Sequence, residues 1–533
     1  MEDFCARLND LPDEIIMIIL KKLYNVEVLY YFIGVNKRLN TIAHDSIFSS
    51  CLNLYQYFSD DDYICPLPDL MLNRFCSQIL PSIHNKIQWL NLESSSMKRI
   101  LSATNYPNLY GLGLYDINVE VVPSLFTDES FFTLIFKNQI LSLVIDIVEN
   151  DEQSSSEYMN IFIFTQIFTM FPNLKYLNFG PSSIFYQRLS FGISPPTIIS
   201  STLLELHVCL DDFIDCLYLL DGRFNQLHSF HVHILFIFTV DTTINNKEKL
   251  SNLKCFSLHC DSTTNSYERS ILPLLYRMIN LEKLDLHLMI LCNQEFVDSY
   301  DLKKNIINRI PGLKNFVFNI RSMRYFCNEI RLPLNEDIQH TFNSLQNNKI
   351  ISYVNYFPEA GYSEYHIYSY PYKLKFYRNI TNNFPGGLFK YVTEVSLFDE
   401  QPFEHEFFLQ IQKSFPFMKE LTVINQKPQN KKQYENFKNY DQTLSIIKYP
   451  HLTLLNLDCV HDDYIEQFLF DTKMSLSNNL YLIIDYQSLA RVTHNFQRNI
   501  TRINCAKLRY LRLHGEYTIL KHVKDYFPYT EIC

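Results

Sequence analysis

A short apolar pattern recurs along most of this chain and constrains its fold more than any other feature. Each copy reads apolar-x-x-apolar-x-apolar and usually follows a turn residue such as asparagine. Successive copies that begin at Leu203, Leu227, Leu253 and Leu281 are 24, 26 and 28 residues apart. The clearest copies are Leu109-Leu112-Leu114, Leu174-Leu177-Phe179, Leu203-Leu206-Val208, Leu227-Phe230-Val232, Leu253-Phe256-Leu258, Leu281-Leu284-Leu286, Leu313-Phe316-Phe318, Val392-Val395-Leu397, Met418-Leu421-Val423, Leu452-Leu455-Leu457 and Leu508-Leu511-Leu513.

The alternation at the end of each copy indicates a short strand with one buried face. The stretches between strands supply a covering layer. The segment from Asp462 to Leu469 is predicted as a capped helix, and the segment from Leu489 to Phe496 as another. Because each unit can bury its apolar face only against its neighbours, the pattern predicts an α/β fold: a curved solenoid with a parallel sheet on its concave face.

The composition excludes several functional classes. The chain has 533 residues, of which 47% are hydrophobic and 15% aromatic, as is typical of a folded protein. A net charge of −10 disfavours a nucleic-acid surface, and 11 glycines leave few sites for phosphate-binding loops. The 13 irregularly spaced cysteines are predicted to be reduced thiols. Residues 1–10 do not resemble a secretory signal and no apolar run reaches about 18 residues, so we expect no membrane partner and a cytoplasmic or nuclear location.

The N-terminal 45 residues are predicted to form three short amphipathic helices. Pro12 stands at the start of the first helix, and aliphatic residues from Ile15 to Leu23 recur at helical spacing. Asn25 and Asn36 are predicted to cap the second and third helices. Three helices this short cannot bury all of their apolar side chains among themselves, so some of these side chains should face a partner or cover the first repeat.

These residues also carry a resemblance to a known family. The order Leu11-Pro12-Asp13-Glu14-Ile15, Ile19-Leu20-x-x-Leu23 and Val35-Asn36-Lys37-Arg38 resembles the F-box motif over residues 8–45. In that family the leucine-proline start and the helix faces dock on a Skp-type adaptor, which binds a cullin scaffold carrying a RING subunit. The resemblance implies an adaptor contact made by Leu11, Pro12, Ile15, Ile19, Leu23, Leu29 and Val35. The alternative is a helical cap that only covers the first repeat.

The repeats resemble the leucine-rich-repeat class, so the whole chain resembles an F-box/leucine-rich-repeat protein. This resemblance implies three parts: an F-box domain at 1–50, a linker and cap at 51–84, and a repeat solenoid at 85–533 with an insertion or degenerate repeats at 321–390. It also implies a non-catalytic substrate-recognition subunit of an SCF-type ubiquitin ligase, with an unidentified protein as target. A ligase-independent interaction scaffold is the alternative function.

Histidines recur at strand positions that should point away from the core. If the strands are parallel, His233, His259 and His287 should form a ladder on one face, at a strand spacing of about 4.8 Å. We expect target contacts on that face, made by His231, His233, His259, Asp285, His287, Arg512 and His514. The histidines could read an acidic or phosphorylated target or respond to pH, but His-x-His without a fixed carboxylate is a weak metal signal, so no metal or cofactor is expected.

Enzyme signatures are missing from the sequence. It contains no Gly-x-x-x-x-Gly-Lys, Gly-x-Ser-x-Gly, His-Glu-x-x-His or Cys-x-x-Cys motif. Without paired zinc cysteines a RING-type mechanism is unavailable to the chain itself. The acidic runs Asp60-Asp61-Asp62 and Asp399-Glu400 are interpreted as solvated loops rather than catalytic carboxylate pairs. A third possible function is an enzyme whose site lies in the tyrosine-rich segment Tyr353 to Tyr377.

Overall fold

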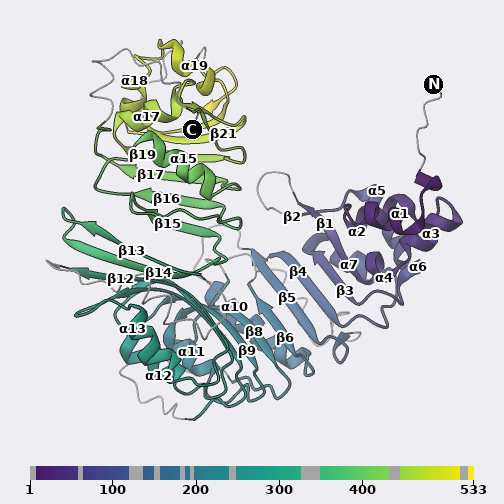
Figure 1. Ribbon diagram of the computed structural model, residues 1–533. Helices are drawn as coiled ribbons and strands as arrows, with labels where there is room; N and C mark the ends of the chain where they lie inside the picture. Colours follow the sequence, from purple (N-terminus) through teal and green to yellow (C-terminus); the bar gives the residue numbers. More distant parts are fainter. Residues whose placement is uncertain are drawn as a thin grey trace, which may run out of the picture. The chain divides into compact units, whose positions relative to one another are not determined.

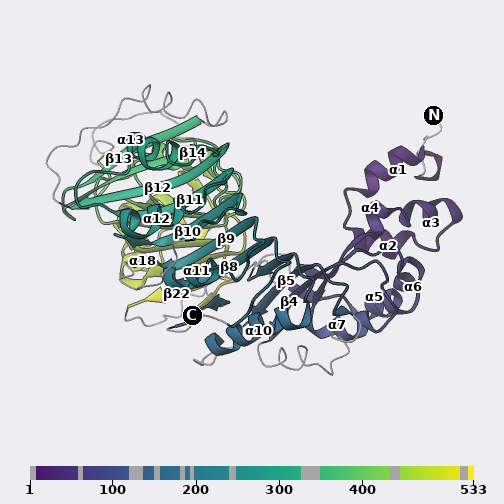
Figure 2. The same cartoon turned by 90° about the horizontal axis from the view of Figure 1, so that it is seen from below.

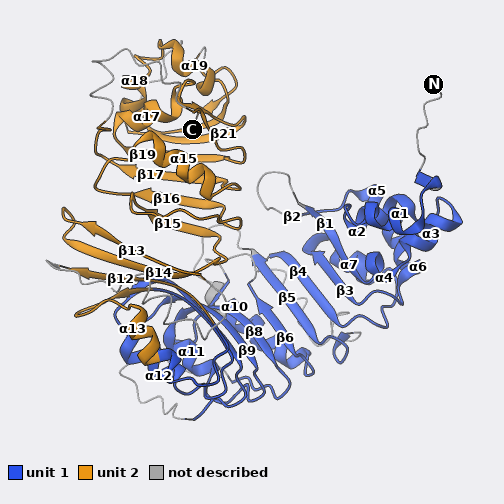
Figure 3. Ribbon diagram, viewed as in Figure 1, with its two compact units in different colours: residues 1–288, 306–315 blue, residues 289–305, 316–533 orange. Residues whose placement is uncertain are grey.

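The computed structural model describes residues 8–57, 64–118, 136–148, 156–180, 187–192, 197–238, 248–325, 349–430, 445–515 and 526–532. The protein is a mixed α/β structure whose strands form mostly parallel sheets, as the alternation predicted (Figure 1). It divides into two compact units, residues 1–288 with 306–315 and residues 289–305 with 316–533 (Figure 3). This division differs from the expected parts 1–50, 51–84 and 85–533, because the N-terminal helices and the first strands belong to one unit. Within the described ranges, no helix is long and apolar enough to cross a membrane.

The first unit is built on a sheet in the order β11-β10-β9-β8-β6-β5-β4-β3-β1-β2, with β7 beside β8. Neighbouring strands from β1 to β10 are parallel, except that β2 pairs antiparallel with β1. The strands are β1 (Cys51–Tyr57), β2 (Ile64–Pro66), β3 (Trp89–Glu93), β4 (Gly111–Asn118), β5 (Ser142–Val148), β6 (Tyr176–Phe179), β7 (Arg188–Leu189), β8 (Glu205–Asp212), β9 (Ser229–Phe236), β10 (Cys255–Thr264) and β11 (Lys283–Leu291). The helices between them include α5 (Asp69–Arg74), α6 (Leu80–Ile83), α7 (Ser94–Leu101), α10 (Ser156–Met170), α11 (Phe213–Leu219) and α12 (Leu272–Leu275).

The repeated pattern explains both the strands and the turns before them. The last two apolar residues of each copy lie in a strand and are buried, as Phe230 and Val232 are in β9. Asparagines at the turns connect consecutive copies of the pattern. Asn252 Nδ2 donates to the carbonyl of Asn225 at 2.7 Å, and Asn280 Nδ2 donates to the carbonyl of Ser251 at 2.7 Å. These hydrogen bonds satisfy turn carbonyls that the strands leave unpaired. This explains why asparagine often stands at the turn before a copy of the pattern.

Four short helices precede the first strand. They are α1 (Asp13–Leu20), α2 (Asn25–Phe32), α3 (Lys37–Ala43) and α4 (Ser46–Ser49) (Figure 2). Helices α2 and α4 pack against β1. Three of them were predicted, and the Asn36 cap is present, since its side chain accepts from the Leu39 amide at 2.8 Å. The sheet begins earlier than expected: Leu52 and Leu54 of β1 are buried in register with β3, within the segment expected to be a linker.

The second unit contains an antiparallel group and a parallel sheet. The antiparallel group joins β12 (Asn315–Tyr325), β13 (Lys349–Phe357) and β14 (Tyr362–Tyr370), with β14 between the other two. The parallel sheet runs β15-β16-β17-β19-β21-β22-β23. Its strands are β15 (Phe376–Ile380), β16 (Glu394–Phe398), β17 (Glu420–Asn425), β19 (Leu454–Val460), β21 (Leu480–Asp485), β22 (Leu508–His514) and β23 (Glu531–Ile532), with helices α15 (His405–Ser414), α17 (Asp462–Leu469), α18 (Tyr486–Val492) and α19 (Asn499–Cys505). Both helices predicted in this unit are present, although α18 ends before Phe496.

An antiparallel hairpin interrupts the parallel strands, in the segment predicted to hold an insertion or degenerate repeats. It occupies the part of the 321–390 segment where no repeat could be placed, while residues 326–348 of that segment lie outside the described residues. Seven consecutive residues of β14, from Ser363 to Ser369, are buried, because this strand is paired on both edges and covered on both faces. A fully buried strand shows no alternation, so the repeat pattern disappears there. The acidic run Asp60-Asp61-Asp62 also lies outside the described residues, and Asp399 and Glu400 accept backbone hydrogen bonds rather than lying free in a loop.

A buried carboxyl in the first unit predicts a pH dependence of stability. Asp215, which is 1% exposed in α11, accepts hydrogen bonds from the backbone amides of Phe191 at 2.8 Å and Asp212 at 3.3 Å. Burial raises the pKa of Asp215 to about 7, against the opposing effect of these hydrogen bonds. The folded state therefore holds this proton up to a higher pH than the unfolded state does, so its contribution to stability is lost as pH rises from about 4 through 7.

We expect Asp215→Asn to remove this pH dependence. Between pH 5 and pH 8, wild type should lose roughly 2–3 kcal/mol relative to the variant. Urea unfolding followed by the fluorescence of Trp89, the single tryptophan and a residue of β3 in the same unit, measures both proteins. If the free energies of unfolding of wild type and Asp215→Asn changed in parallel across this pH range, Asp215 would ionise normally in the folded state.

Candidate functional site

Helix α1 carries apolar side chains on two sides. Ile16 and Leu20 are buried, whereas Ile15, Ile18 and Ile19 are 43%, 57% and 42% exposed. The three exposed isoleucines are spaced i, i+3 and i+4, so they share one side of the helix, here called the α1 apolar face. Because about half of each side chain is already covered, complete burial by a partner would contribute about 0.7–1.5 kcal/mol per side chain, which favours a partner over this face.

The segment before α1 is held in place by the third helix. Arg38 Nε donates to Asp13 Oδ1 at 2.6 Å, and Arg38 Nη2 donates to the carbonyl of Leu11. Pro12 adopts an extended conformation as the residue before the helix. The Leu11-Pro12 start and the Arg38 segment, which are 25 residues or more apart in sequence, therefore form one local structure.

Most residues predicted to contact an adaptor lie at the surface. Pro12, Ile15, Ile19, Leu23 and Val35 are exposed, and Leu11 is half-buried. Leu29 is an exception, because its side chain is 0% exposed where α2 packs against α4 and β1. Leu29 therefore belongs to the core and is removed from the predicted contact.

The sequence analysis missed three exposed apolar residues near this surface. Ile18 completes the α1 apolar face, and its helical spacing from Ile15 could have identified it. Tyr24 and Tyr31, at 71% and 61% exposed, stand before and within α2. No periodicity distinguishes the outward tyrosines from the inward valines of this helix, because the whole helix is apolar apart from Asn25 and Glu27.

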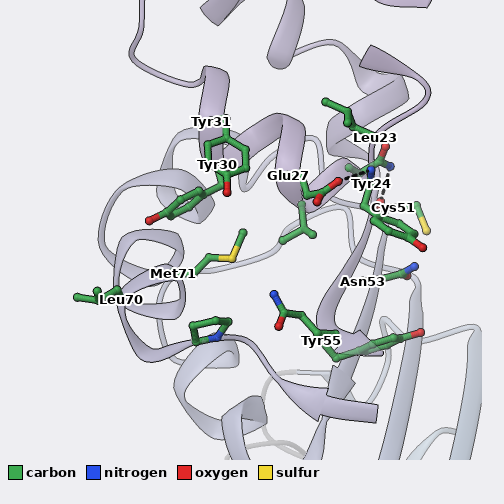
Figure 4. A pocket seen from close by; sticks show the side chains of 14 residues that line it. Leu23, Tyr24, Glu27, Tyr30, Tyr31, Cys51, Asn53, Tyr55, Leu70 and Met71 are labelled. Atoms are coloured by element: carbon green, nitrogen blue, oxygen red, sulfur yellow. Dashed lines mark hydrogen bonds between the residues drawn. The ribbon is translucent and has the colours of Figure 1, made fainter. Parts of the chain in front are cut away.

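A groove of about 710 Å³ lies beside these residues, between α2, β1 and α5. Figure 4 shows Tyr30 and Tyr31 from α2, Leu70 and Met71 from α5, and Tyr55 from β1 around it. The residues that line the groove are Leu23, Tyr24, Asn25, Val26, Glu27, Tyr30, Tyr31, Cys51, Asn53, Tyr55, Gln56, Pro68, Leu70 and Met71, of which Glu27 alone is charged. Leu23 is thus both a predicted adaptor contact and part of the groove wall.

The second candidate site is a histidine-rich face of the sheet in the first unit. Parallel pairing places His207 of β8 opposite His231 of β9, and His233 of β9 opposite His259 of β10. These side chains, with His287 of β11, alternate with buried apolar residues and are themselves half-buried. We call the five histidines the histidine face.

The predicted ladder of His233, His259 and His287 is present. The ring centroids of His233 and His259 are 6.4 Å apart, and those of His259 and His287 are 5.6 Å apart. Carboxylates lie among the rings: Asp261 Oδ2 is 3.5 Å from His233 Nε2 and Asp261 Oδ1 is 3.3 Å from His287 Nε2, while Asp285 Oδ2 is 3.5 Å from His259 Nε2. Burial alone would raise the pKa of Asp261, but hydrogen bonds from His233 and His287, together with their charges, lower it below its usual range.

At the β8 end of the histidine face, two imidazoles and a carboxylate meet. His207 Nε2 lies 2.7 Å from Glu205 Oε1, and the rings of His207 and His231 stack at 4.2 Å between centroids. One ligand atom from each of these three residues lies within 4.8 Å of the other two. Burial, and next the charge of His207, lower the pKa of His231 to about 4, so its imidazole is neutral at pH 7. Of this triad, only His231 was predicted from the sequence, although Glu205 and His207 share one face of β8 by the same two-residue alternation.

The remaining predicted target residues belong to the second unit. Arg512 is exposed on β22, and His514 Nδ1 lies 2.8 Å from Asp458 Oδ1. Both residues are on β22, two positions apart. The tyrosine-rich segment forms a buried network instead of an open site: His366 Nδ1 lies 2.9 Å from the Tyr353 hydroxyl, and that hydroxyl lies 3.3 Å from the Tyr377 hydroxyl.

Neither protein-family models nor curated protein sequences gave a match to this chain. The function of the protein is therefore inferred from its own residues. Two features carry that inference, the α1 apolar face with its neighbouring groove and the histidine face.

Proposed function

We propose that this chain is the substrate-recognition subunit of an SCF-type (Skp-cullin-F-box) ubiquitin ligase. In this proposal residues 8–45 act as an F-box that docks on a Skp-type adaptor, and the strand-helix units act as leucine-rich repeats that bind a target protein. The adaptor connects the chain to a cullin-RING scaffold. The chain does not itself form the bond between ubiquitin and the target. It holds the target close to the ubiquitin-loaded enzyme, and this proximity increases the rate of transfer.

The α1 apolar face is the observation that carries this proposal. A helix that served only to cover the first repeat would turn its aliphatic side chains inward, yet Ile15, Ile18 and Ile19 remain exposed after Ile16 and Leu20 are buried. The Arg38 contacts hold the Leu11-Pro12 start next to this face. A rigid helix with a row of exposed aliphatic side chains is suited to docking in an apolar groove of a partner.

The histidine face supports the target-binding half of the proposal. Parallel strands present its side chains at fixed spacing, so recognition costs little ordering of the surface. Asp261 and Asp285 accept from the imidazoles and orient them. Imidazole and carboxylate groups held in this way suit polar contacts with a target segment.

The proposal is tested by purifying the tagged full-length chain from cells and quantifying the Skp-type adaptor and the cullin that accompany it. Wild type should retain both proteins, whereas Ile18→Asp should reduce their recovery at least about tenfold, because a charge replaces an apolar contact. Ile199→Asp is the matched control, since Ile199 is 78% exposed and lies outside the N-terminal helices. Recovery of neither adaptor nor cullin with wild type would favour the ligase-independent scaffold instead.

A further inference from the structure

We propose that Glu205, His207 and His231 form a binding site for a divalent transition metal, with Zn²⁺ as the best fit. The sheet brings these three residues together: Glu205 and His207 are two residues apart on β8, and His231 is the register partner of His207 on β9. Residues at i and i+2 of one strand and at the opposed position of the next project from the same face. One ligand atom from each lies within 4.8 Å of the others.

The donor set selects the class of metal. Two imidazole nitrogens are borderline ligands and one carboxylate oxygen is a hard ligand, and this mixed set suits Zn²⁺ better than Ca²⁺ or Mg²⁺, because the latter two prefer all-oxygen sites. Three protein ligands leave the fourth tetrahedral position open for water or for a side chain of another molecule. The site would thus differ from a closed structural zinc site.

The side chains can close around an ion with small rotations. Ligand atoms of a tetrahedral Zn²⁺ lie roughly 3.4 Å apart, at bond lengths near 2.1 Å. Glu205 Oε1 and His207 Nε2 are already 2.7 Å apart and share a hydrogen bond, so binding an ion between them replaces one proton. The side chains of Glu205 and His207 are 37% and 28% exposed, so the carboxylate has room to turn and solvent can deliver the ion.

The surroundings of the triad are polar and ordered. Tyr176 of β6 packs against His207, with ring centroids 5.4 Å apart, on the side away from His231. His207 is therefore flanked by rings on both sides, which restricts its orientation. A ligand whose ring orientation is restricted in advance loses less conformational entropy when the metal binds.

The site is tested by titrating Zn²⁺ alone into the purified full-length chain, by calorimetry, after the affinity tag is removed and accessible thiols are alkylated. Alkylation prevents binding by exposed cysteines such as Cys51 and Cys459. Wild type should bind one equivalent. Glu205→Gln, which preserves the shape of the side chain, and His207→Ala should each weaken binding at least about tenfold, with unchanged far-ultraviolet circular dichroism.

His287→Ala is the matched control. His287 belongs to the same face and lies 3.3 Å from Asp261, but it is not part of the triad. Its substitution should leave the Zn²⁺ affinity unchanged. The proposal is overturned if wild type binds no stoichiometric Zn²⁺, if all variants bind as wild type does, or if His287→Ala rather than Glu205→Gln abolishes binding, which would place the ion at Asp261.

Discussion

Arg321→Met should destabilise the second unit by about 3–5 kcal/mol, the largest stability effect that we expect from a single substitution. Arg321 lies on β12 with its side chain 9% exposed, and its guanidinium is 3.8 Å from Glu364 Oε1 on β14. Burial alone would lower the pKa of Arg321, but the charge of Glu364 raises it above its usual value. The side chain of Glu364 is only 6% exposed. Removing the Arg321 cation leaves its carboxylate buried without a counter-charge, which is costly in a medium of low dielectric.

The network around this pair increases the cost. Asn355 Nδ2 donates to Glu364 Oε1 at 3.0 Å, and Thr381 Oγ1 donates to Asn355 Oδ1 at 2.6 Å. The guanidinium carbon of Arg321 also lies 5.6 Å from the centre of the Tyr377 ring, a favourable cation–π distance. One substitution therefore disturbs several buried polar groups that depend on one another.

Differential scanning calorimetry of the full chain measures the effect. The double variant Arg321→Met/Glu364→Gln should recover much of the loss, because it removes both charges together. Arg378→Met, at an exposed position of β15, is the matched control and should stay within about 0.5 kcal/mol of wild type. A single variant as stable as wild type would mean that Glu364 is protonated or solvated in the folded protein.

The double substitution Ile15→Asp/Ile19→Asp should weaken binding of a Skp-type adaptor by about 100-fold or more. Each of these two aliphatic side chains contributes roughly 1 kcal/mol when an interface buries its exposed part, and each aspartate adds a desolvation cost. Both positions are more than 40% exposed in the free protein, so the fold should tolerate the changes. Biolayer interferometry with purified adaptor measures the affinity.

A matched double control separates docking from general charge effects. Ile199→Asp/Ile503→Asp changes two isoleucines that are 78% and 56% exposed and lie outside the N-terminal helices. The control should bind the adaptor as wild type does. Equal affinities for all three proteins would show that the adaptor does not contact the α1 apolar face.

The repeated strands could be predicted from sequence because each exposes one face and buries the other. Phe230 and Val232 alternate with His231 and His233, and this alternation survives in β9. The turn asparagines recur with the pattern, but their hydrogen bonds are not local, since Asn252 and Asn280 bond to turns 27 and 29 residues earlier in the chain. Strand β14 could not be predicted in this way, because its burial comes from antiparallel neighbours on both edges rather than from its own pattern.

The candidate sites were predictable only in part. The His233 to His287 ladder follows from parallel register, which the sequence does encode. Leu29 was assigned to the surface because the helical pattern of α2 identifies apolar residues but not which of them face β1. Glu205 was overlooked although the two-residue alternation of β8 places it on the same face as His207.

Titration of purified Skp-type adaptor into the purified full-length chain, by calorimetry, tests the central claim most directly. Docking through the N-terminal helices predicts a one-to-one complex with a Kd below about 1 μM. No complex at adaptor concentrations of about 100 μM would contradict the assignment of residues 8–45 as an adaptor-binding F-box.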